Sequence, residues 1–415
     1  MTPESEAELT QTQDPATLPP DESHALPSTE GEPSLPSPIE EAHGEDVPAE
    51  AAPVETAAPE VMPPPPAPEL VAAAAIVAPA PMGMDDLAAV EFCKTSYANI
   101  QYELSKVIVG QSKVVEEILI AIFTRSHALL VGVPGLAKTL LISTLAETLN
   151  MSFKRIQFTP DLMPSDITGT EVIYQDPDSG EKQFKFLPGP LFSNVVLADE
   201  INRTPPKTQA AMLEAMQERR ITVGGVTRDL PKPFFVLATQ NPLEQEGTYP
   251  LPEAQLDRFL FLIFVDYPSD DEETLIMKMG TGAAGEKPQA VLNAEQVLFI
   301  QKTVKSVPVP DHVYLYAKRI VRATRAKTPE ALPFCKKWLS FGAGPRASLS
   351  LIMAAKAHAL INGQTYVGCH NVAAVAHSIM RHRIALNFEA MGEEMTTDKI
   401  VTMLLEAIPQ DEPLK

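Results

Sequence analysis

A short apolar run that leads directly into a glycine-containing loop and then into a helical pattern is the most restrictive feature of this sequence. Residues 127–131 (HALLV) have the length and composition of a buried strand, and residues 140–149 have apolar positions at helical spacing. The loop between them reads GVPGLAKT, residues 132–139. Such a loop turns backbone N–H groups and the positive end of the following helix toward an anion. The sequence therefore predicts a phosphate-binding loop in an α/β domain.

Two side chains of this loop have defined chemical roles in nucleotide binding. Lys138 is placed to reach the β- and γ-phosphates, and the Thr139 hydroxyl is a ligand for Mg²⁺. The general pattern has glycine at the sixth loop position, where this chain has Ala137, the smallest replacement. The residues expected to contact nucleotide are Gly132, Val133, Pro134, Gly135, Leu136, Ala137, Lys138, Thr139 and Leu140.

A pair of carboxylates follows a second apolar strand about sixty residues later. Residues 194–198 (NVVLA) run into Asp199 and Glu200. ATP hydrolysis requires a carboxylate that holds Mg²⁺, here Asp199, and a second that polarises the attacking water, here Glu200. After a phosphate-binding loop, this pair at the end of a strand predicts the hydrolytic centre.

Three further polar residues are candidates for contact with the γ-phosphate. Asn241 follows a third strand, residues 234–238 (FFVLA), at the sheet edge where ligands bind in doubly wound folds. Arg258 ends a short helix and is predicted to act on a neighbouring subunit. Arg346 stands beside Pro345 at the start of a helix, which gives the cation a rigid mount.

The charge of the chain is unevenly distributed. The 415 residues have a formal net charge of -21, but residues 1–84 contain 16 of the 54 acidic residues, 18 of the 40 prolines and no Lys, Arg, Phe, Tyr or Trp. Such a segment buries too little apolar surface to offset the entropy of ordering, so we predict a disordered acidic Pro/Ala/Glu-rich tail. A solubilising extension and a tether to a partner both remain open for it.

Composition also excludes several classes of protein. No basic region precedes an apolar segment at the N-terminus, as a secretory signal requires. The apolar stretch at residues 70–82 is too short and too rich in proline to span a bilayer. A large nucleic-acid footprint needs clustered Lys and Arg, which this acidic chain lacks. We therefore expect a cytoplasmic protein with no membrane insertion and no stable binding of nucleic acid.

Taken together, these motifs resemble the AAA+ ATPases of the MoxR family. The resemblance covers roughly residues 95–385 and rests on VGQ (109–111), GVPGLAKT, LADEINR (197–203), PPKTQAAMLEAMQER (205–219), ATQNP, LPEAQLDRF and GPR (344–346). Two departures are visible: Gly344 stands where the family often has Ser, and the acidic tail is no part of the family core.

The resemblance assigns a role to each candidate. It implies that Val109 and Gly110 border the adenine pocket. Lys138 and Thr139 then belong to Walker A, and Asp199 and Glu200 to Walker B. Sensor 1, the trans-acting arginine finger and sensor 2 correspond respectively to Asn241, Arg258 and Arg346.

The resemblance further implies an AAA+ α/β core with a parallel sheet and β-hairpin inserts at residues 85–268, and a small α-helical lid domain at 269–415. It implies a homo-oligomer, a hexameric ring, that uses ATP and Mg²⁺ to remodel or mature a protein client. That client is often a von Willebrand A domain protein or a complex that receives a metal or cofactor. A nucleotide-switched scaffold and a nucleic-acid motor are the alternatives.

Two hairpins are predicted as inserts. Residues 159–193 alternate in polarity around a DPDSG turn beside a helical flank, and residues 220–233 centre on a Gly-Gly turn. The resemblance places the first toward the pore of a ring, while surface hairpins without substrate contact stay open as the other interpretation.

Overall fold

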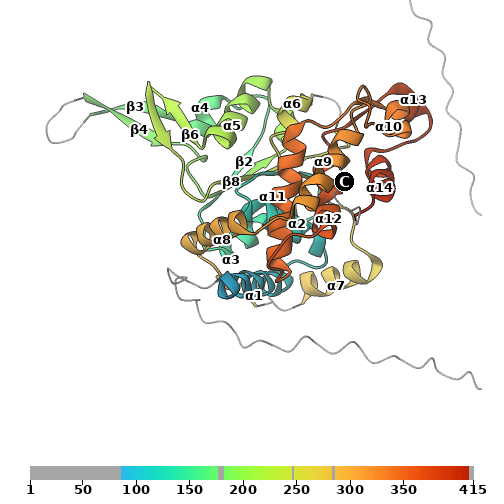
Figure 1. The fold of residues 1–415 in the computed structure, drawn as a ribbon. Helices are drawn as coiled ribbons and strands as arrows, with labels where there is room; N and C mark the ends of the chain where they lie inside the picture. The colour runs from blue at the N-terminus through green and yellow to red at the C-terminus, as the bar shows by residue number, and fades with distance from the viewer. Residues whose placement is uncertain (1–85, 176–181, 245–246, 283–285, 411–415) are drawn as a thin grey trace, which may run out of the picture. The chain divides into compact units, whose positions relative to one another are not determined.

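A five-stranded parallel sheet forms the centre of the molecule (Figure 1). The computed structural model describes residues 86–175, 182–244, 247–282 and 286–410. The strand order is β2-β5-β8-β1-β9, and every neighbouring pair is parallel. The strands are β1 (Ala128–Val131), β2 (Phe153–Gln157), β5 (Val195–Asp199), β8 (Phe235–Gln240) and β9 (Phe261–Phe264). The predicted α/β fold with a parallel sheet is confirmed.

Helices cover both faces of this sheet because its strands are apolar on both sides. Leu130 and Leu197 belong to one buried cluster, and their neighbours Leu129 and Val196 belong to the other. The first cluster includes residues of α1 (Asp86–Ser105), α2 (Ser112–Phe123) and α3 (Lys138–Thr148). The second includes residues of α4 (Pro164–Thr168) and α5 (Pro206–Glu218). Burial on both faces is typical of a parallel sheet.

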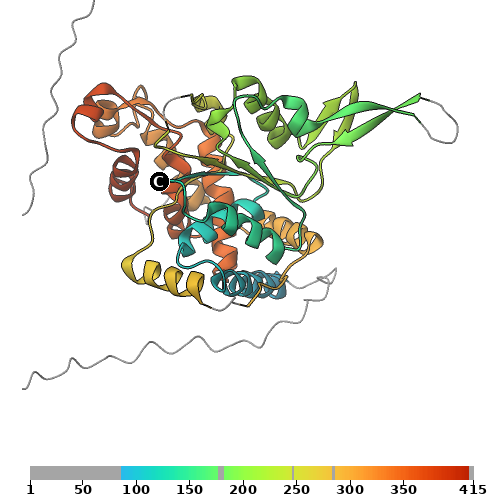
Figure 2. The same ribbon diagram turned by 180° about the vertical axis from the view of Figure 1, so that it is seen from behind.

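Both predicted hairpins are present, and both lie on the side of α4 and α5 (Figures 1 and 2). The first pairs β3 (Gly169–Gln175) with β4 (Lys182–Pro188), and the second pairs β6 (Arg220–Val223) with β7 (Val226–Asp229). The β3–β4 hairpin extends away from the body of the fold, and its side chain Phe184 is 77% exposed. Its DPDSG turn lies outside the described residues.

The C-terminal part is a helical lid. Two short helices belong to the core, η1 (Ile201–Arg203) after β5 and α6 (Glu253–Leu256) before β9, and α7 (Asp270–Thr281) follows β9. The lid helices are α8 (Ala294–Ser306), α9 (Asp311–Ala323), α10 (Pro333–Trp338), α11 (Pro345–Ile361), α12 (Cys369–Met380), α13 (Phe388–Gly392) and α14 (Thr397–Ala407). The lid also contains a small antiparallel pair, β10 (Leu339–Phe341) with β11 (Ala385–Leu386). These strands were not expected, because two or three residues are too few to show an alternating pattern.

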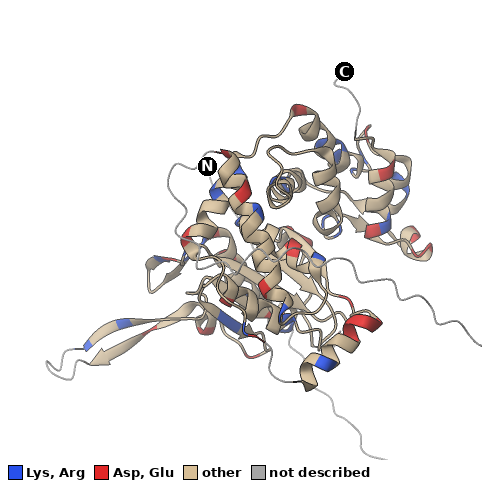
Figure 3. Cartoon of the chain, turned by 90° about the horizontal axis from the view of Figure 1, so that it is seen from below, with Lys and Arg blue, Asp and Glu red and all other residues tan. Residues whose placement is uncertain are grey.

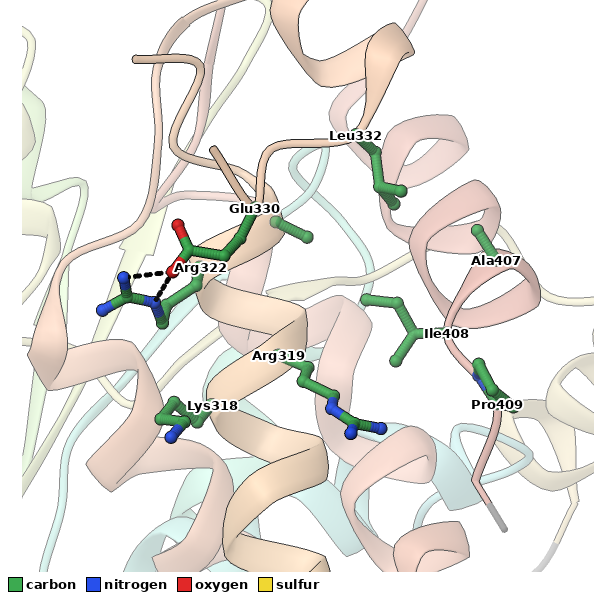
Figure 4. A pocket seen from close by; sticks show the side chains of 9 residues that line it. Lys318, Arg319, Arg322, Glu330, Leu332, Ala407, Ile408 and Pro409 are labelled. Atoms are coloured by element: carbon green, nitrogen blue, oxygen red, sulfur yellow. Dashed lines mark hydrogen bonds and ion pairs between the residues drawn. The ribbon is translucent and has the colours of Figure 1, made fainter. Parts of the chain in front are cut away.

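The lid contains a cavity of about 570 Å³ between α9 and the end of α14 (Figure 4). Arg322 and Glu330 form an ion pair of 2.5 Å at its edge, and Leu332 and Ile408 supply apolar surface. None of the residues predicted to bind nucleotide lines this cavity.

The chain divides into two units, Met1–Ala67 and Pro68–Lys415, and all described residues belong to the second. The predicted disordered tail, residues 1–84, lies outside the described residues. Within the described ranges, every helix is either too short or too polar to cross a bilayer. In the view of Figure 3, Lys and Arg are interspersed with Asp and Glu over the described elements.

Candidate functional site

The predicted phosphate-binding loop connects β1 to the first residue of α3, as expected. Gly132 is required by a close approach of the chain, because a Cβ atom there would lie 2.6 Å from the carbonyl oxygen of Val265, just after β9. Gly135 has a φ of 88° with open space around it. Ala137 has a φ of 53° and a ψ of 22°, the left-handed region that favours glycine. The backbone at position 137 therefore has a conformation that glycine adopts readily, although the residue there is alanine.

Lys138, at the end of the loop, is influenced by the charges of the two carboxylates at the end of β5. Its ammonium group donates a hydrogen bond to the carbonyl oxygen of Gly132, so the side chain folds back over its own loop. Partial burial lowers the pKa of Lys138, and the charges of Asp199 and Glu200 oppose that shift. The loop cation and the carboxylate pair therefore lie near enough to interact electrostatically.

Asp199 is the last residue of β5, and each of its carboxylate oxygens accepts a hydrogen bond from another side chain. Arg155, on the adjacent strand β2, forms an ion pair of 2.6 Å with Oδ2. The Thr239 hydroxyl, near the end of β8, donates to Oδ1 at 2.5 Å. The same hydroxyl oxygen accepts the backbone N–H of Glu200 at 2.9 Å. Thr239 thus links the carboxylate of Asp199 to the backbone of Glu200, a role that sequence analysis did not assign.

Glu200 has a φ of 56°, which turns the chain out of β5 into η1. Gln157, the last residue of β2, donates to Glu200 Oε2 at 2.6 Å, and Arg203 donates to the same oxygen at 3.1 Å. Gln157 and Asp199 are register partners in the parallel ladder, so the sheet itself brings Gln157 to this edge. In the sequence, Gln157 could be recognised only as a polar residue at the end of a strand, which does not indicate contact with Glu200.

Asn241 lies one residue beyond β8, beside the end of β5, as predicted. The side chain is buried, and its carboxamide oxygen accepts the backbone N–H of Leu243 at 3.1 Å. The structure therefore places Asn241 at the sheet edge that carries Asp199 and Glu200.

Comparison with known proteins agrees with this geometry. Residues 127–261 match the ATPase family associated with various cellular activities (AAA), and residues 335–404 match the AAA lid domain. Chaperone MoxR1 of Mycobacterium tuberculosis is 44% identical over 314 residues, which cover 74% of this chain and 81% of that protein. The chain belongs to the MoxR family of AAA+ ATPases.

Other relatives extend over the same part of this MoxR-family chain. The uncharacterized protein YeaC of Bacillus subtilis is 41% identical over 74% of this chain and 92% of its own length. A crystal structure from Cytophaga hutchinsonii is 40% identical with a TM-score of 0.73, and the match covers 78% of this chain and 98% of that one.

In this MoxR-family chain, a cavity of about 300 Å³ lies between α2, the end of β9 and the lid helix α12. Val109, Gln111, Lys113, Glu117, Phe264, Tyr267, Glu272, Ser378 and Arg381 are among the residues that line it. Gln111 also donates a hydrogen bond of 3.4 Å to the carbonyl oxygen of Leu136, so the cavity adjoins the phosphate-binding loop. The predicted base-binding residue Val109 lines this cavity, whereas Gly110 lines a neighbouring cavity of about 240 Å³.

A buried acid joins the core to the lid at this cavity. Glu117 of α2 is 6% exposed, and the Ser378 hydroxyl of α12 donates to its carboxyl group at 2.5 Å. Burial raises the pKa of Glu117, and the bond from Ser378 opposes that shift. The contact was not expected from the sequence, because its partners are separated by 261 positions.

The two remaining predicted residues, Arg258 and Arg346, contact other parts of the molecule than Asp199 and Glu200. Arg258 lines a cavity of about 750 Å³ together with Glu214 and Gln217 of α5. Lys138, Asp199 and Glu200 are not among the residues that line that cavity. Arg346, at the start of α11, forms an ion pair of 3.2 Å with Asp257. Their predicted roles toward nucleotide stay predictions.

The residues present fit a nucleotide with Mg²⁺. The loop turns about Gly135 and Ala137, and α3 directs its N-terminal end toward the loop, an arrangement that binds phosphate. Thr139 and Asp199 offer the hydroxyl and carboxylate oxygens that Mg²⁺ prefers. Asp199 Oδ2 would have to exchange Arg155 for the metal or one of its waters.

Proposed function

We propose that the chain binds ATP with Mg²⁺ and hydrolyses it, and that this reaction drives the remodelling or maturation of a protein complex. One observation carries the proposal: β1, which leads into the loop of Lys138, and β5, which ends in Asp199, both pair in parallel with β8, so the loop and the carboxylates share one edge of the sheet. Membership of the AAA+ ATPases supports the activity in general.

Each residue of the site then has a step. Lys138 and the loop N–H groups bind the phosphate oxygens, and Thr139 and Asp199 hold the metal. Mg²⁺ bound there would supply positive charge beside the phosphate oxygens. Glu200 takes the proton of the attacking water, while its Oε2 accepts hydrogen bonds from Gln157 and Arg203. Asn241 orients that water from the neighbouring strand.

We further propose a hexameric ring. Arg258 lines a cavity with Glu214 and Gln217 of α5, and we propose that it contacts the γ-phosphate of a nucleotide held by another subunit. An arginine supplied in this way contributes a factor of about 10³ to 10⁵ in rate. Mycobacterial MoxR1 carries the name chaperone, which favours a protein client. A von Willebrand A domain protein, or a complex that receives a metal or cofactor, is the client that we propose from the resemblance.

The hydrolytic role of Glu200 is tested by Glu200→Gln. We expect this variant to bind ATP and to release no phosphate, because an amide cannot accept the proton of the water. Glu244→Gln is the matched control, since Glu244 also pairs with Arg203, at 3.7 Å, but is not a residue to which we assign a step of the reaction. Phosphate release by Glu200→Gln at the wild-type rate contradicts the assignment, and a wild-type protein that binds ATP without turnover favours the nucleotide-switched scaffold.

The client is sought with the same variant. Glu200→Gln held in the ATP-bound state should retain a client that the wild-type chain releases, so proteins captured only with ATP present are the candidates. Acceleration of the wild-type ATPase by DNA and not by a captured protein would favour the nucleic-acid motor instead.

A further inference from the structure

One carboxylate at the junction of core and lid is shared by two arginines of the lid. Asp257 is the residue directly before Arg258 and is 33% exposed. Its Oδ1 accepts a hydrogen bond from Arg383 Nε at 2.8 Å, and its Oδ2 accepts one from Arg346 Nη1 at 3.2 Å. Two cations therefore compete for one anion, and the cluster keeps a surplus positive charge.

The two arginines are held with very different strength. The Arg383 side chain is only 2% exposed and also donates to the backbone carbonyl oxygens of Phe259 at 2.6 Å and Leu260 at 3.0 Å. These bonds fix the segment that follows α12 to the segment that leads into β9. Arg383 cannot leave Asp257 without leaving buried acceptors unpaired, which is costly.

Arg346 is free to exchange. Its side chain is 52% exposed, and in the part of the chain that the structure describes it has one hydrogen bond, the one to Asp257. A guanidinium group has five N–H donors in a planar fork that suits phosphate as well as carboxylate. Pro345 and α11 fix the backbone of Arg346, so only its side chain needs to move.

A cavity at this junction shares one lining residue with the cavity beside Val109. Asp257, Gly344 and Arg383 are among the residues that line a cavity of about 500 Å³, and Arg381 lines both this cavity and the one beside Val109. The Arg381 guanidinium lies over the Phe264 ring, 4.4 Å from its centroid. The Asp257 cluster is thus adjacent to the place where nucleotide is proposed to bind.

We propose that Asp257 is a positioning residue that holds Arg346 on the core while no nucleotide is bound, and that a phosphate group of bound ATP takes Arg346 from it. This inference rests on the proposed binding of ATP. Asp257 then acts as a built-in competitor of the nucleotide, and ATP affinity includes the free energy of breaking the pair between Asp257 and Arg346.

The experiment is a double-mutant cycle on ATP binding. The full chain carrying Glu200→Gln, which prevents turnover, is titrated with ATP and Mg²⁺ by calorimetry. The cycle consists of this parent, Asp257→Asn, Arg346→Ala and the combination. Asparagine keeps an oxygen for Arg383 but cannot accept from both arginines, so Arg346 is released.

We expect Asp257→Asn to tighten ATP binding about two- to five-fold, the range for a partly exposed pair worth up to about 1 kcal/mol. In the Arg346→Ala background the same change should leave affinity unchanged. Glu330→Gln is the matched control, because it removes a carboxylate from the exposed pair with Arg322 elsewhere in the lid (Figure 4) and should not alter affinity.

Two results overturn the inference alone: Asp257→Asn fails to tighten binding, or tightens it equally without Arg346. If the parent binds no ATP, the proposed function fails together with the inference. Thermal unfolding of each variant verifies folding, and Asp257→Ser, which also keeps an oxygen for Arg383, replaces a variant that does not fold and carries the same expectation.

Discussion

At the scale of single residues, Arg155 occupies the oxygen of Asp199 that a metal would approach. Its guanidinium donates to Oδ2 through both Nε, at 3.0 Å, and Nη2, at 2.6 Å. The side chain of Asp199 is 13% exposed, whereas that of Arg155 is 48% exposed. Solvent therefore weakens the pair, and Arg155 can be displaced at low cost.

Replacing Arg155 should make magnesium easier to bind. In Arg155→Gln we expect the Mg²⁺ concentration that gives half-maximal ATP binding to fall about two- to five-fold, because a partly exposed pair worth up to about 1 kcal/mol no longer competes. Titration of Mg²⁺ at fixed ATP in the Glu200→Gln background measures it, with Arg322→Gln as a control for loss of an exposed arginine. An unchanged or higher Mg²⁺ requirement contradicts the competition.

The buried histidine His127 should make the free energy of unfolding depend on pH. The imidazole of His127 accepts the N–H of Val236 at Nδ1 and donates from Nε2 to the carbonyl oxygen of Met216. Burial lowers the pKa of His127 to about 4. The unfolded chain, with a pKa near 6.5, binds more protons between these values, so stability should fall as pH falls from about 6.5 to 4.

If the unfolded chain binds one proton more than the folded chain, the free energy of unfolding changes by about 1.4 kcal/mol per pH unit. His127→Gln should reduce this slope, measured by urea unfolding at several pH values. Part of the slope should remain, because burial also lowers the pKa of His382. Equal slopes in the wild-type chain and in the variant would show that His127 does not titrate on unfolding.

At the scale of elements, the sheet and the loop were predictable because their signals are local. Each central strand is a run of four or more apolar residues buried on both faces, and the chemistry begins where that run ends. Asp199 and Asn241 could be placed at one edge because parallel strands share their direction. The same argument did not identify Arg155 and Gln157, since β2 has no long apolar run and its side chains reach across to the neighbouring strand.

The contacts between core and lid could not be predicted in this way. Ser378 meets Glu117, and Arg383 meets Asp257, over separations of more than a hundred positions that no pattern connects. Gly110 lines a cavity beside the one that Val109 lines, and its predicted contact with the base stays a prediction. Such pairings depend on how the lid docks on the core.

Lid docking itself should depend strongly on Arg383. We expect Arg383→Ala to lower the free energy of unfolding by about 3 kcal/mol or more, because Asp257 and the buried carbonyl oxygens lose their donor. Chemical unfolding measures the loss. Arg322→Ala removes an exposed arginine of the lid and should cost less than about 1 kcal/mol. A similar small cost for Arg383→Ala would mean that its buried bonds do not stabilise the fold.

At the scale of the whole molecule, the two arginines predicted to contact the γ-phosphate have other neighbours in this structure. Arg346 forms an ion pair with Asp257, and Arg258 lines a cavity together with Glu214 and Gln217. In our account Arg346 moves to the ATP of its own subunit and Arg258 reaches the ATP of a neighbouring subunit, so activity should depend on protein concentration as well as on ATP.

The most direct test mixes two inactive variants. Arg258→Ala keeps an intact loop but offers no finger, and Lys138→Ala offers a finger but has no functional loop. If the active site is shared between subunits, a mixture should release phosphate faster than either variant alone, because some interfaces combine the intact loop with the intact arginine. Phosphate release that stays at the level of the separate variants at every mixing ratio would contradict the shared site.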